Sequence, residues 1–364
     1  MIRRILLRLV KHLDGWLLAF LGVLMLIGLV VLYSASDQNI DRISAQAMNM
    51  AVALGVMWAV ANVPPQHLMR LAVPAYAIGL LLLLGVALFG DVSHGARRWL
   101  NLGVTRIQPS ELMKIAVPLM LAWHFNRHEA NLRLKHYAIA ALLLVVPIGL
   151  IAKQPDLGTA LLISASGFYV IFLAGLSWRI LLGLGIVGAA SMPLLWSVMH
   201  DYQRQRILTL LDPSQDPLGA GYHTIQSTIA LGSGGALGKG WLHGTQAHLD
   251  FLPERTTDFI FAVFAEEFGL IGNLLLLSLF LIIIGRGLII AANGPTLFAR
   301  LLGGSLTLTF FTYAFVNMGM VSGILPVVGV PLPLISYGGT SMVTVLLSFG
   351  ILMSIQTHPK LVTT

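Results

Sequence analysis

The sequence has little charge and no cysteine. Only 10% of its 364 residues are Asp, Glu, Lys or Arg, against about 25% in an average soluble domain, while 57% are apolar. A soluble fold of this size could not keep so much apolar surface away from water. The absence of cysteine excludes disulfide bonds and thiolate metal sites. The composition excludes an ordinary soluble enzyme and a disordered chain, and it predicts an integral membrane protein.

Long runs without charge predict the membrane spans, since one span needs about 20 residues. The expected spans are residues 15–36, 43–69, 71–90, about 108–123, 136–152, 157–178, 180–200, 259–285 and two more within 301–359. Arg70 is expected to separate the second span from the third, with Pro64 and Pro65 marking the turn. The predicted fold is an all-α integral membrane protein with about ten transmembrane helices, forming a single polytopic domain over residues 1–364.

The distribution of basic residues orients this bundle, because Lys and Arg accumulate on the cytoplasmic side of a membrane. With the N-terminus inside, that side carries a large basic excess against only Asp14 and Glu129. Its basic residues are Arg3, Arg4, Arg8, Lys11, Arg70, Arg127, Arg133, Lys135, Arg179, Arg286, Arg300 and Lys360. Both termini are therefore expected in the cytoplasm. Residues 201–257, between the seventh and eighth helices, are expected to form a large extracytoplasmic loop that is ordered and contains a helix over 222–231.

Charged residues at membrane depth are candidates for function, since each costs at least about 2.5–3.5 kcal/mol there. Glu111 and Lys114 are three residues apart, so they share a helix face and can neutralise each other. A structural ion pair and a functional pair are equally compatible with this spacing. Asp156 lies in a short outer turn after Lys153, where a capping role is also plausible.

A further cluster, residues 253–259, precedes the eighth span. Asp258 could act only as a helix cap, but a carboxylate at this height could also accept a proton from a substrate hydroxyl. Glu266 and Glu267 lie on other faces of the helix, so they are expected to serve helix contacts or to line a cavity. The segment 321–339 contains too many glycines and prolines for straight helix and must pack inside protein or line a cavity.

Four segments together resemble one family. They are Arg106-Ile-Gln108-Pro-Ser-Glu111-Leu-Met-Lys114, Gln154-Pro-Asp156-Leu-Gly158-Thr159, Glu254-Arg255-Thr-Thr-Asp258-Phe259 and Pro331-Leu-Pro-Leu-Ile-Ser336-Tyr337-Gly-Gly339. In this order they resemble the shape, elongation, division and sporulation family over nearly the whole chain. Residues 201–206 and 211–213, with very short tails, are similar to the branch of that family that serves cell elongation.

The resemblance implies a peptidoglycan glycosyltransferase that polymerises lipid II, facing the periplasm, in the cytoplasmic (inner) membrane of a bacterium. It implies as partners a class B penicillin-binding protein transpeptidase and other membrane proteins of the elongation complex. No nucleic acid partner is expected, because the basic residues are scattered between apolar runs.

The same resemblance carries over the role of one residue, and the charge of the substrate and the cost of intramembrane charge suggest the others. Asp258 would be the catalytic general base, supported by the intramembrane pair Glu111 and Lys114. Candidate substrate-binding residues are Arg106, Gln108, Lys153, Asp156, Arg204, Arg206, Arg255 and Ser336. A divalent cation, Mg²⁺ or Mn²⁺, could assist, although no metal ligands are assigned.

Two other functions stay open at this point. A lipid II flippase would also need about ten helices, broken segments and intramembrane charge. A scaffold that only holds its transpeptidase would need none of the polar residues at the outer mouth. For the partner's membrane helix, the small residues Gly303, Gly304, Ser305 and Gly319, together with Asn317, offer a candidate face.

Overall fold

The computed structural model describes residues 11–93, 96–101, 106–154, 156–199, 201–215, 219–248, 252 and 254–358. Ten long helices account for most of it: α2 (Gly15–Ala35), α3 (Ile40–Ala61), α4 (Pro65–Phe89), α5 (Pro109–Arg127), α6 (Leu134–Ala152), α7 (Leu157–Leu173), α8 (Trp178–Val198), α12 (Ile260–Ala292), α13 (Leu297–Val321) and α14 (Gly339–Thr357). Each corresponds to one expected span. Seven of the described helices, namely α2, α3, α4, α6, α12, α13 and α14, are long and apolar enough to cross a membrane by themselves.

One expected boundary is wrong. The break between the second and third spans lies at residues 62–64 and not at Arg70, which is an exposed residue inside α4. Pro65 opens α4 because proline lacks a backbone N–H and is tolerated in the first helical turn. The position of the turn is therefore set by Pro64 and Pro65, and a single arginine at the membrane edge does not end a helix.

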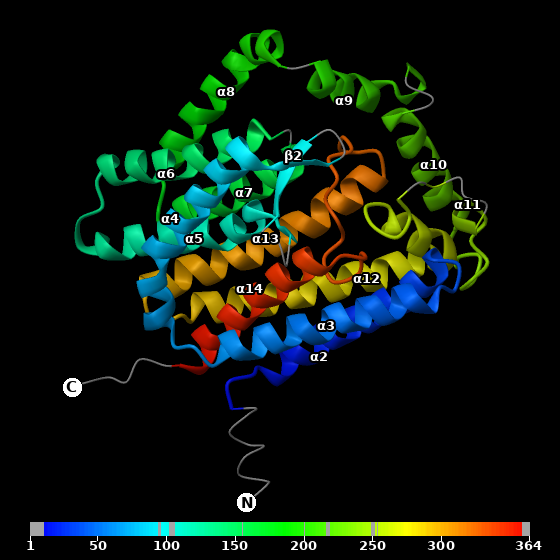
Figure 1. Cartoon of the computed structure of the whole chain (residues 1–364), viewed down its shortest axis with the longest axis horizontal. Coiled ribbons are helices and arrows are strands. Elements are labelled where there is room, and N and C mark those ends of the chain that lie inside the picture. The colour runs from blue at the N-terminus through cyan, green and yellow to red at the C-terminus, as the bar shows by residue number, and fades with distance from the viewer. Residues whose placement is uncertain are drawn as a thin grey trace, which may run out of the picture.

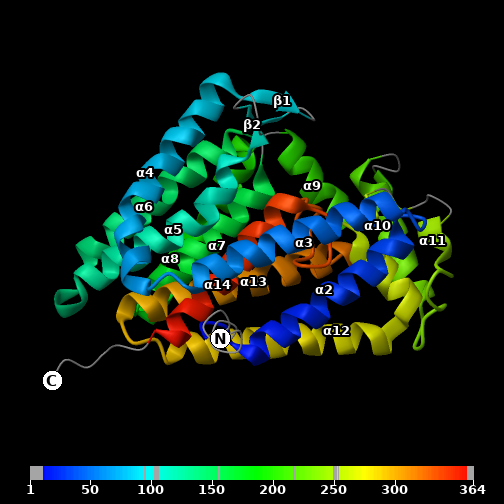
Figure 2. The same cartoon turned by 60° about the horizontal axis from the view of Figure 1, so that its bottom comes forward.

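The long helices form a layered bundle (Figures 1 and 2). Helix α14 packs along α3, α12 packs along α13 and α2, and α5, α7 and α13 pack against one another in the middle. The described ends of the chain meet, because the His12 and His358 rings stack 4.3 Å apart and His12 Nδ1 lies 3.2 Å from Thr357 Oγ1. Both described ends thus lie at one end of the bundle, here called the inner end. The basic residues Arg3, Arg4, Arg8 and Lys360 lie outside the described residues.

Helix α8 stands apart from the other long helices (Figure 1). Most of its side chains are exposed, including Leu182, Ile186 and Leu194 at 67%, 70% and 68%. A helix that is apolar on all sides is stable when lipid surrounds it. The structure therefore places α8 at the edge of the bundle, where lipid can surround it.

The long loop after α8 is ordered in its described parts. It contains α9 (Asp201–Leu211), the 3₁₀ turn η2 (Pro213–Gln215), α10 (Ala220–Ser233) and α11 (Thr245–His248). Helix α10 covers the helix expected over 222–231 and packs against α12. A small antiparallel sheet between α4 and α5 was not expected from the sequence: β1 (Asp91–Ser93), β2 (Ala96–Asn101) and β3 (Arg106–Ile107), in the order β1-β2-β3. A further 3₁₀ turn, η1 (Glu129–Asn131), links α5 to α6.

Helix α12 is broken at Gly269, where φ is 64° and ψ is −163°. A left-handed φ favours glycine. The segment 235–240 fills the break with backbone hydrogen bonds. The N–H groups of residues 270 and 271 donate to the carbonyls of 235 and 236, at 2.9 and 3.1 Å. Those of residues 239 and 240 donate to the carbonyls of 266 and 267, each at 3.0 Å. The long loop is thereby joined to the start of α12.

The small-residue face on α13 is used inside this chain. Gly303, Gly304, Ser305, Asn317 and Gly319 are all buried. A Cβ on Gly304 would lie 2.6 Å from Leu173 Cδ1, and the Ser305 hydroxyl donates to the Ser166 carbonyl at 2.7 Å. The prediction that this face receives the partner's membrane helix is therefore wrong, because close approach between helices of the same chain already needs these small residues.

Candidate active site

Asp258 lies in the turn 254–259 that precedes α12, so it is not a residue of the helix itself. The turn is closed by its own backbone, because the Phe259 N–H donates to the Glu254 carbonyl at 3.2 Å. The Phe259 ring stacks on His223 of α10, with the ring centres 5.5 Å apart. The long loop and the start of α12 thus hold Asp258 at the end of the bundle opposite to the described termini.

Asn317 and Ser336 fix the backbone of this turn. The buried Asn317 amide of α13 donates to the carbonyls of Asp258 and Val330, at 2.8 and 2.7 Å. The Ser336 hydroxyl donates to the Thr257 carbonyl at 2.6 Å and accepts the Leu332 N–H at 2.8 Å. Since Ser336 uses its hydroxyl on backbone groups, its contacts favour a role in holding the site over direct contact with substrate.

The irregular segment 322–338 lies between the Asp258 carboxylate and the start of α7, where Asp156 caps the helix. Gly329, at a φ of 72°, lies against the Asp258 side chain, since a Cβ on it would be 3.4 Å from Asp258 Oδ2. On its other side, Gly158 at the start of α7 approaches so closely that a Cβ there would lie 2.7 Å from the Val328 carbonyl. The segment therefore packs inside protein, as expected, with Asp258 on one side and the start of α7 on the other.

Asp156 caps α7 and also collects polar groups from two other elements. Its Oδ1 accepts the Thr159 N–H at 3.2 Å, which is the capping role weighed from the sequence. Its Oδ2 accepts the Gln108 amide at 3.2 Å and lies 3.9 Å from Nε of Arg98 on β2. The structure thus brings together Gln108 and Asp156, and it adds Arg98, which no sequence pattern indicated.

The other candidate cations differ in how firmly they are held. Arg255 pairs with Asp37 in the link after α2, and Lys153 is exposed at the end of α6. Arg204 donates to the carbonyls of Trp196 and Ser197, at 2.9 and 2.8 Å, and so binds α9 to the end of α8. Arg206 also belongs to α9. Arg106 lies in β3, but its side chain is outside the described part of the chain.

The Glu111–Lys114 pair lies one helical turn further into the bundle than Gln108. Lys114 Nζ is 2.6 Å from Glu111 Oε1 and 5.2 Å from the centre of the Tyr313 ring. The Thr344 hydroxyl lies 3.0 Å from the other Glu111 oxygen. Lys114 is only 5% exposed, so α5, α13 and α14 jointly surround its charge. The pair faces the interior of the bundle, beside a narrow cavity that Tyr313 and Thr344 also line.

The environment of Asp258 changes its acidity. Burial, and then the nearby Glu254 carboxylate, raise the pKa of Asp258 from 3.8 to about 6. Among the residues that the structure describes, none donates a hydrogen bond to this carboxylate. A carboxylate with such a pKa is ionised at neutral pH and is a stronger base than an ordinary aspartate.

The donor set for a divalent cation is small. Within the described ranges, no group of three or more His, Asp or Glu residues could hold a metal ion. Mg²⁺ often takes only one or two carboxylates and completes its shell with water and substrate phosphates. Assistance by Mg²⁺ or Mn²⁺ stays a prediction.

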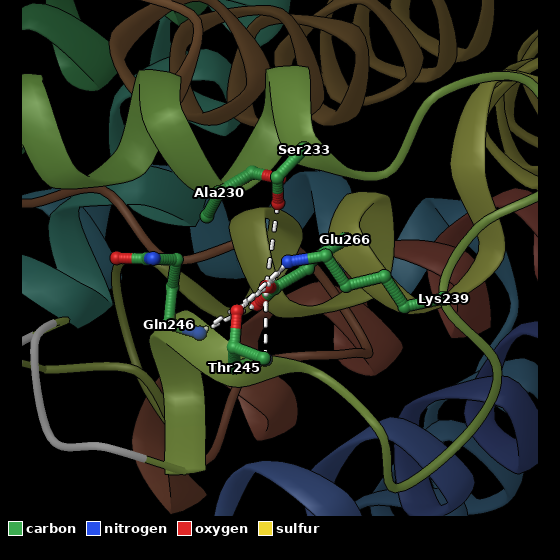
Figure 3. A network of polar contacts seen from close by, with 6 residues as sticks. All are labelled: Ala230, Ser233, Lys239, Thr245, Gln246 and Glu266. Carbon is green, nitrogen blue, oxygen red and sulfur yellow. Dashed lines mark hydrogen bonds and ion pairs between the residues drawn. The ribbon is translucent and has the colours of Figure 1, made fainter.

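A buried carboxylate fastens the long loop behind the turn (Figure 3). Glu266 is fully buried, and its Oε1 lies 2.6 Å from Lys239 Nζ and 2.9 Å from the Thr245 N–H. Ser233 and the Gln246 N–H also donate to it, at 3.3 and 3.1 Å. The expectation that Glu266 serves helix contacts is confirmed.

We expect Lys239→Met to loosen this fastening, because it removes the cation from a carboxylate that stays buried. The loss should lower the free energy of unfolding by about 2 kcal/mol, the size of a charged hydrogen bond. Thermal unfolding of the purified chain measures it, with the exposed Lys153→Met as the matched control. Equal unfolding temperatures for the two variants would show that the remaining donors suffice for Glu266.

Comparison with known proteins identifies the family. The family model described as cell cycle protein, FTSW_RODA_SPOVE, matches residues 11–361. The chain belongs to this family. Among its relatives, the peptidoglycan glycosyltransferase MrdB of Escherichia coli strain K12 is 54% identical over 352 residues, 96% of this chain and 95% of that protein. As a member of the FtsW/RodA/SpoVE family, the chain is a multi-pass bacterial membrane protein.

Solved structures agree with the fold over nearly the whole chain. A chain in a peptidoglycan synthase complex that coordinates polymerization and crosslinking matches with a TM-score of 0.82 and 35% identity, covering 94% of this chain and 97% of that one. The crystal structure of the rod shape determining protein RodA of Thermus thermophilus matches with a TM-score of 0.72 and 30% identity, covering 94% and 96%. The helical membrane fold expected from the sequence is confirmed.

Proposed function

We propose that this chain is a peptidoglycan glycosyltransferase that polymerises lipid II into glycan strands during cell elongation, with Asp258 as its general base. The observation that carries the proposal is the Asp258 carboxylate itself. It has a raised pKa, it lies at the outer mouth of a membrane bundle, and it belongs to a chain 54% identical to a peptidoglycan glycosyltransferase. Its backbone is held by Asn317 and by the long loop, so the carboxylate can be positioned without using its own oxygens.

The reaction joins a sugar hydroxyl to the anomeric carbon of a lipid-linked sugar. Asp258 accepts the hydroxyl proton as the oxygen attacks, and the bond to the diphosphate breaks with the electron pair leaving on the diphosphate oxygen. General-base catalysis of this kind contributes typically 10²–10⁴-fold in rate. The departing diphosphate needs positive charge nearby. Lys153 and Arg98 are the candidates closest to the Asp156 turn, and Arg255 shares the turn with Asp258.

The proposed setting is the cytoplasmic membrane, with both termini inside and residues 201–257 facing the periplasm. The excess of Lys and Arg near the inner end supports this orientation. The lipid tail of the substrate would stay in the membrane while its sugars reach the turn 254–259. A class B penicillin-binding protein would crosslink the product. This agrees with the match to a chain of a peptidoglycan synthase complex that coordinates polymerization and crosslinking.

Purified chain supplied with lipid II in a bilayer or detergent tests the function. Glycan strands should form while penicillin blocks every transpeptidase, and gel separation of labelled product measures them. Transport of labelled lipid II across vesicle membranes without polymer would instead identify a flippase, which the buried Glu111–Lys114 pair would also suit. If neither activity appears, even with the transpeptidase partner present, the chain acts as a scaffold.

The raised pKa predicts a pH profile. Asp258 must be ionised to accept a proton, so the rate should be flat above about pH 7 and fall as the pH drops through 6. In Glu254→Gln the neighbouring negative charge is gone, so the pKa falls and the acid limb should move to lower pH. Initial rates measured from pH 5 to 8 check both curves. If the rate of Glu254→Gln falls at the same pH as that of the parent chain, the fall is not caused by protonation of Asp258.

A further inference from the structure

The inner end of the bundle contains a pocket of about 340 Å³ that the proposed reaction does not use. It lies where α5 ends and α6 begins, about 28 Å from the start of α5, as the 19-residue length of that helix requires. Five of its seven lining residues are arginine, lysine or histidine, and within the described part of the chain no acid lines it. The lining residues are Arg127, His128, Ala130, Asn131, Arg133, Lys135 and His136.

His136 shows that the pocket is a built site and not only a patch of exposed cations. It is 6% exposed, and its Nδ1 accepts the Arg133 N–H at 3.1 Å. A nitrogen that accepts has no proton, so the neutral ring carries its proton on Nε2. Among the described residues no acceptor is found for this Nε2–H. The buried ring thus keeps a donor for a molecule in the pocket.

Neighbouring histidines hold that ring in place. The His136 ring stacks on His128, with centres 4.3 Å apart, and the His136 carbonyl accepts Nε2–H of His124 at 3.1 Å. The His128 Nδ1–H donates to the His124 carbonyl at 2.8 Å, so Nε2 of the neutral His128 ring carries no proton and can only accept a hydrogen bond. Three imidazoles are therefore fixed in their orientation before any ligand arrives.

The charges around the pocket favour an anion. Arg133, Lys135 and His136 belong to the N-cap and first turn of α6, where the helix dipole is positive. Arg127 adds a guanidinium that stacks over the Trp123 ring at 5.4 Å. The acid of the connecting turn, Glu129, pairs instead with Arg300 of α13 at 3.8 Å.

The depth of the pocket indicates where its ligand comes from. Trp123 lies beside it, and Trp16 and Trp178, each 72% exposed, mark the same end of the bundle. Tryptophan is enriched at the level of the lipid headgroups. Basic pockets between helices at this level bind the headgroups of anionic lipids.

We propose that this pocket binds a phosphate group, as carried by the headgroup of an anionic phospholipid. Arginine forks from Arg127 and Arg133 match phosphate oxygens, and His136, a mostly buried ring that lines the same pocket, supplies its Nε2–H as a further donor. The site is independent of the proposed glycosyltransferase chemistry, because it lies at the other end of the bundle. Occupation by a membrane lipid would fix the α5–α6 turn at the headgroup level.

The test compares lipid retention by the full chain in nanodiscs of phosphatidylcholine with a minority of phosphatidylglycerol. Native mass spectrometry counts retained phosphatidylglycerol. Removing Arg127 and Arg133 as Arg127→Gln/Arg133→Gln should weaken retention at least about tenfold, since each hydrogen bond lost between a charged side chain and the phosphate is worth about a tenfold change. The matched control is Arg70→Gln/Arg179→Gln, which removes two exposed arginines from the same end outside the pocket. It should retain the lipid like the parent chain.

A second variant removes only the imidazole donor. In His136→Asn the amide oxygen can still accept the Arg133 N–H, so the fold should persist, while the Nε2–H is lost. Retention should fall several-fold at an unchanged unfolding temperature. Titration with inorganic phosphate in phosphatidylcholine alone distinguishes the sources. Phosphate binding that the double variant abolishes, without lipid retention, would identify a soluble phosphate ligand. Equal lipid retention by all four proteins, with no phosphate binding, would overturn the proposal.

Discussion

Asp258→Asn should lower the rate of glycan polymerisation at least about 10²-fold, in a chain that folds normally. The amide keeps the shape of the carboxylate but cannot accept the proton of the attacking hydroxyl. The backbone contacts of the turn do not involve the side chain, since Asn317 binds the Asp258 carbonyl. Polymer formed from labelled lipid II by purified variant and parent measures the effect.

The stability of this variant provides the decisive comparison. Because burial raises the pKa of Asp258 above its unfolded value of 3.8, the stabilising contribution of the protonated group is lost as the pH rises through about 6. The ionised side chain therefore disfavours folding at neutral pH, and Asp258→Asn should unfold at a temperature no lower than the parent. Asp41→Asn, an exposed carboxylate near the same end, is the matched control and should keep its activity. Near-normal polymerisation by folded Asp258→Asn would remove Asp258 from the role of base.

The sequence predicted the spans well because a membrane helix must be long, apolar and nearly free of charge, and all three properties can be read directly from the sequence. It placed Asp258, Gln108 and Asp156 at the outer mouth for the same reason: they stand at the ends of such runs. The pairing of Gln108 with Asp156 was not visible, because it depends on how α5 and α7 pack.

The errors have physical causes of the same kind. Asn317 was assigned to a partner interface because it lies among small residues. Those residues are instead buried against other segments of the same chain, and Asn317 binds the Val330 carbonyl. Arg98 was missed because its strand is short and lies between two spans. The break of α12 at Gly269 could not be read from a charge-free run, since the hydrogen bonds that replace the helical ones come from residues 235–240.

Lys114→Met should destabilise the chain by about 3–5 kcal/mol, the largest stability loss expected here. Among the described residues it leaves the Glu111 carboxylate, at membrane depth, with the Thr344 hydroxyl as its one remaining partner. Glu111→Gln should be costly as well, because it leaves the buried Lys114 ammonium without its anion. Thermal unfolding of the purified chain measures both.

The double variant Glu111→Gln/Lys114→Met separates structure from function. With both charges gone no ion is left unpaired, so most of the lost stability should return. Charge reversal should recover less, because a glutamate at residue 114 would face the electron-rich ring of Tyr313 that Lys114 now contacts. If the stable double variant polymerises lipid II normally, the pair only joins α5, α13 and α14. We expect it to remain impaired, because the pair borders the interior cavity one turn below Gln108 and Asp156, where a charge can act on the substrate's diphosphate.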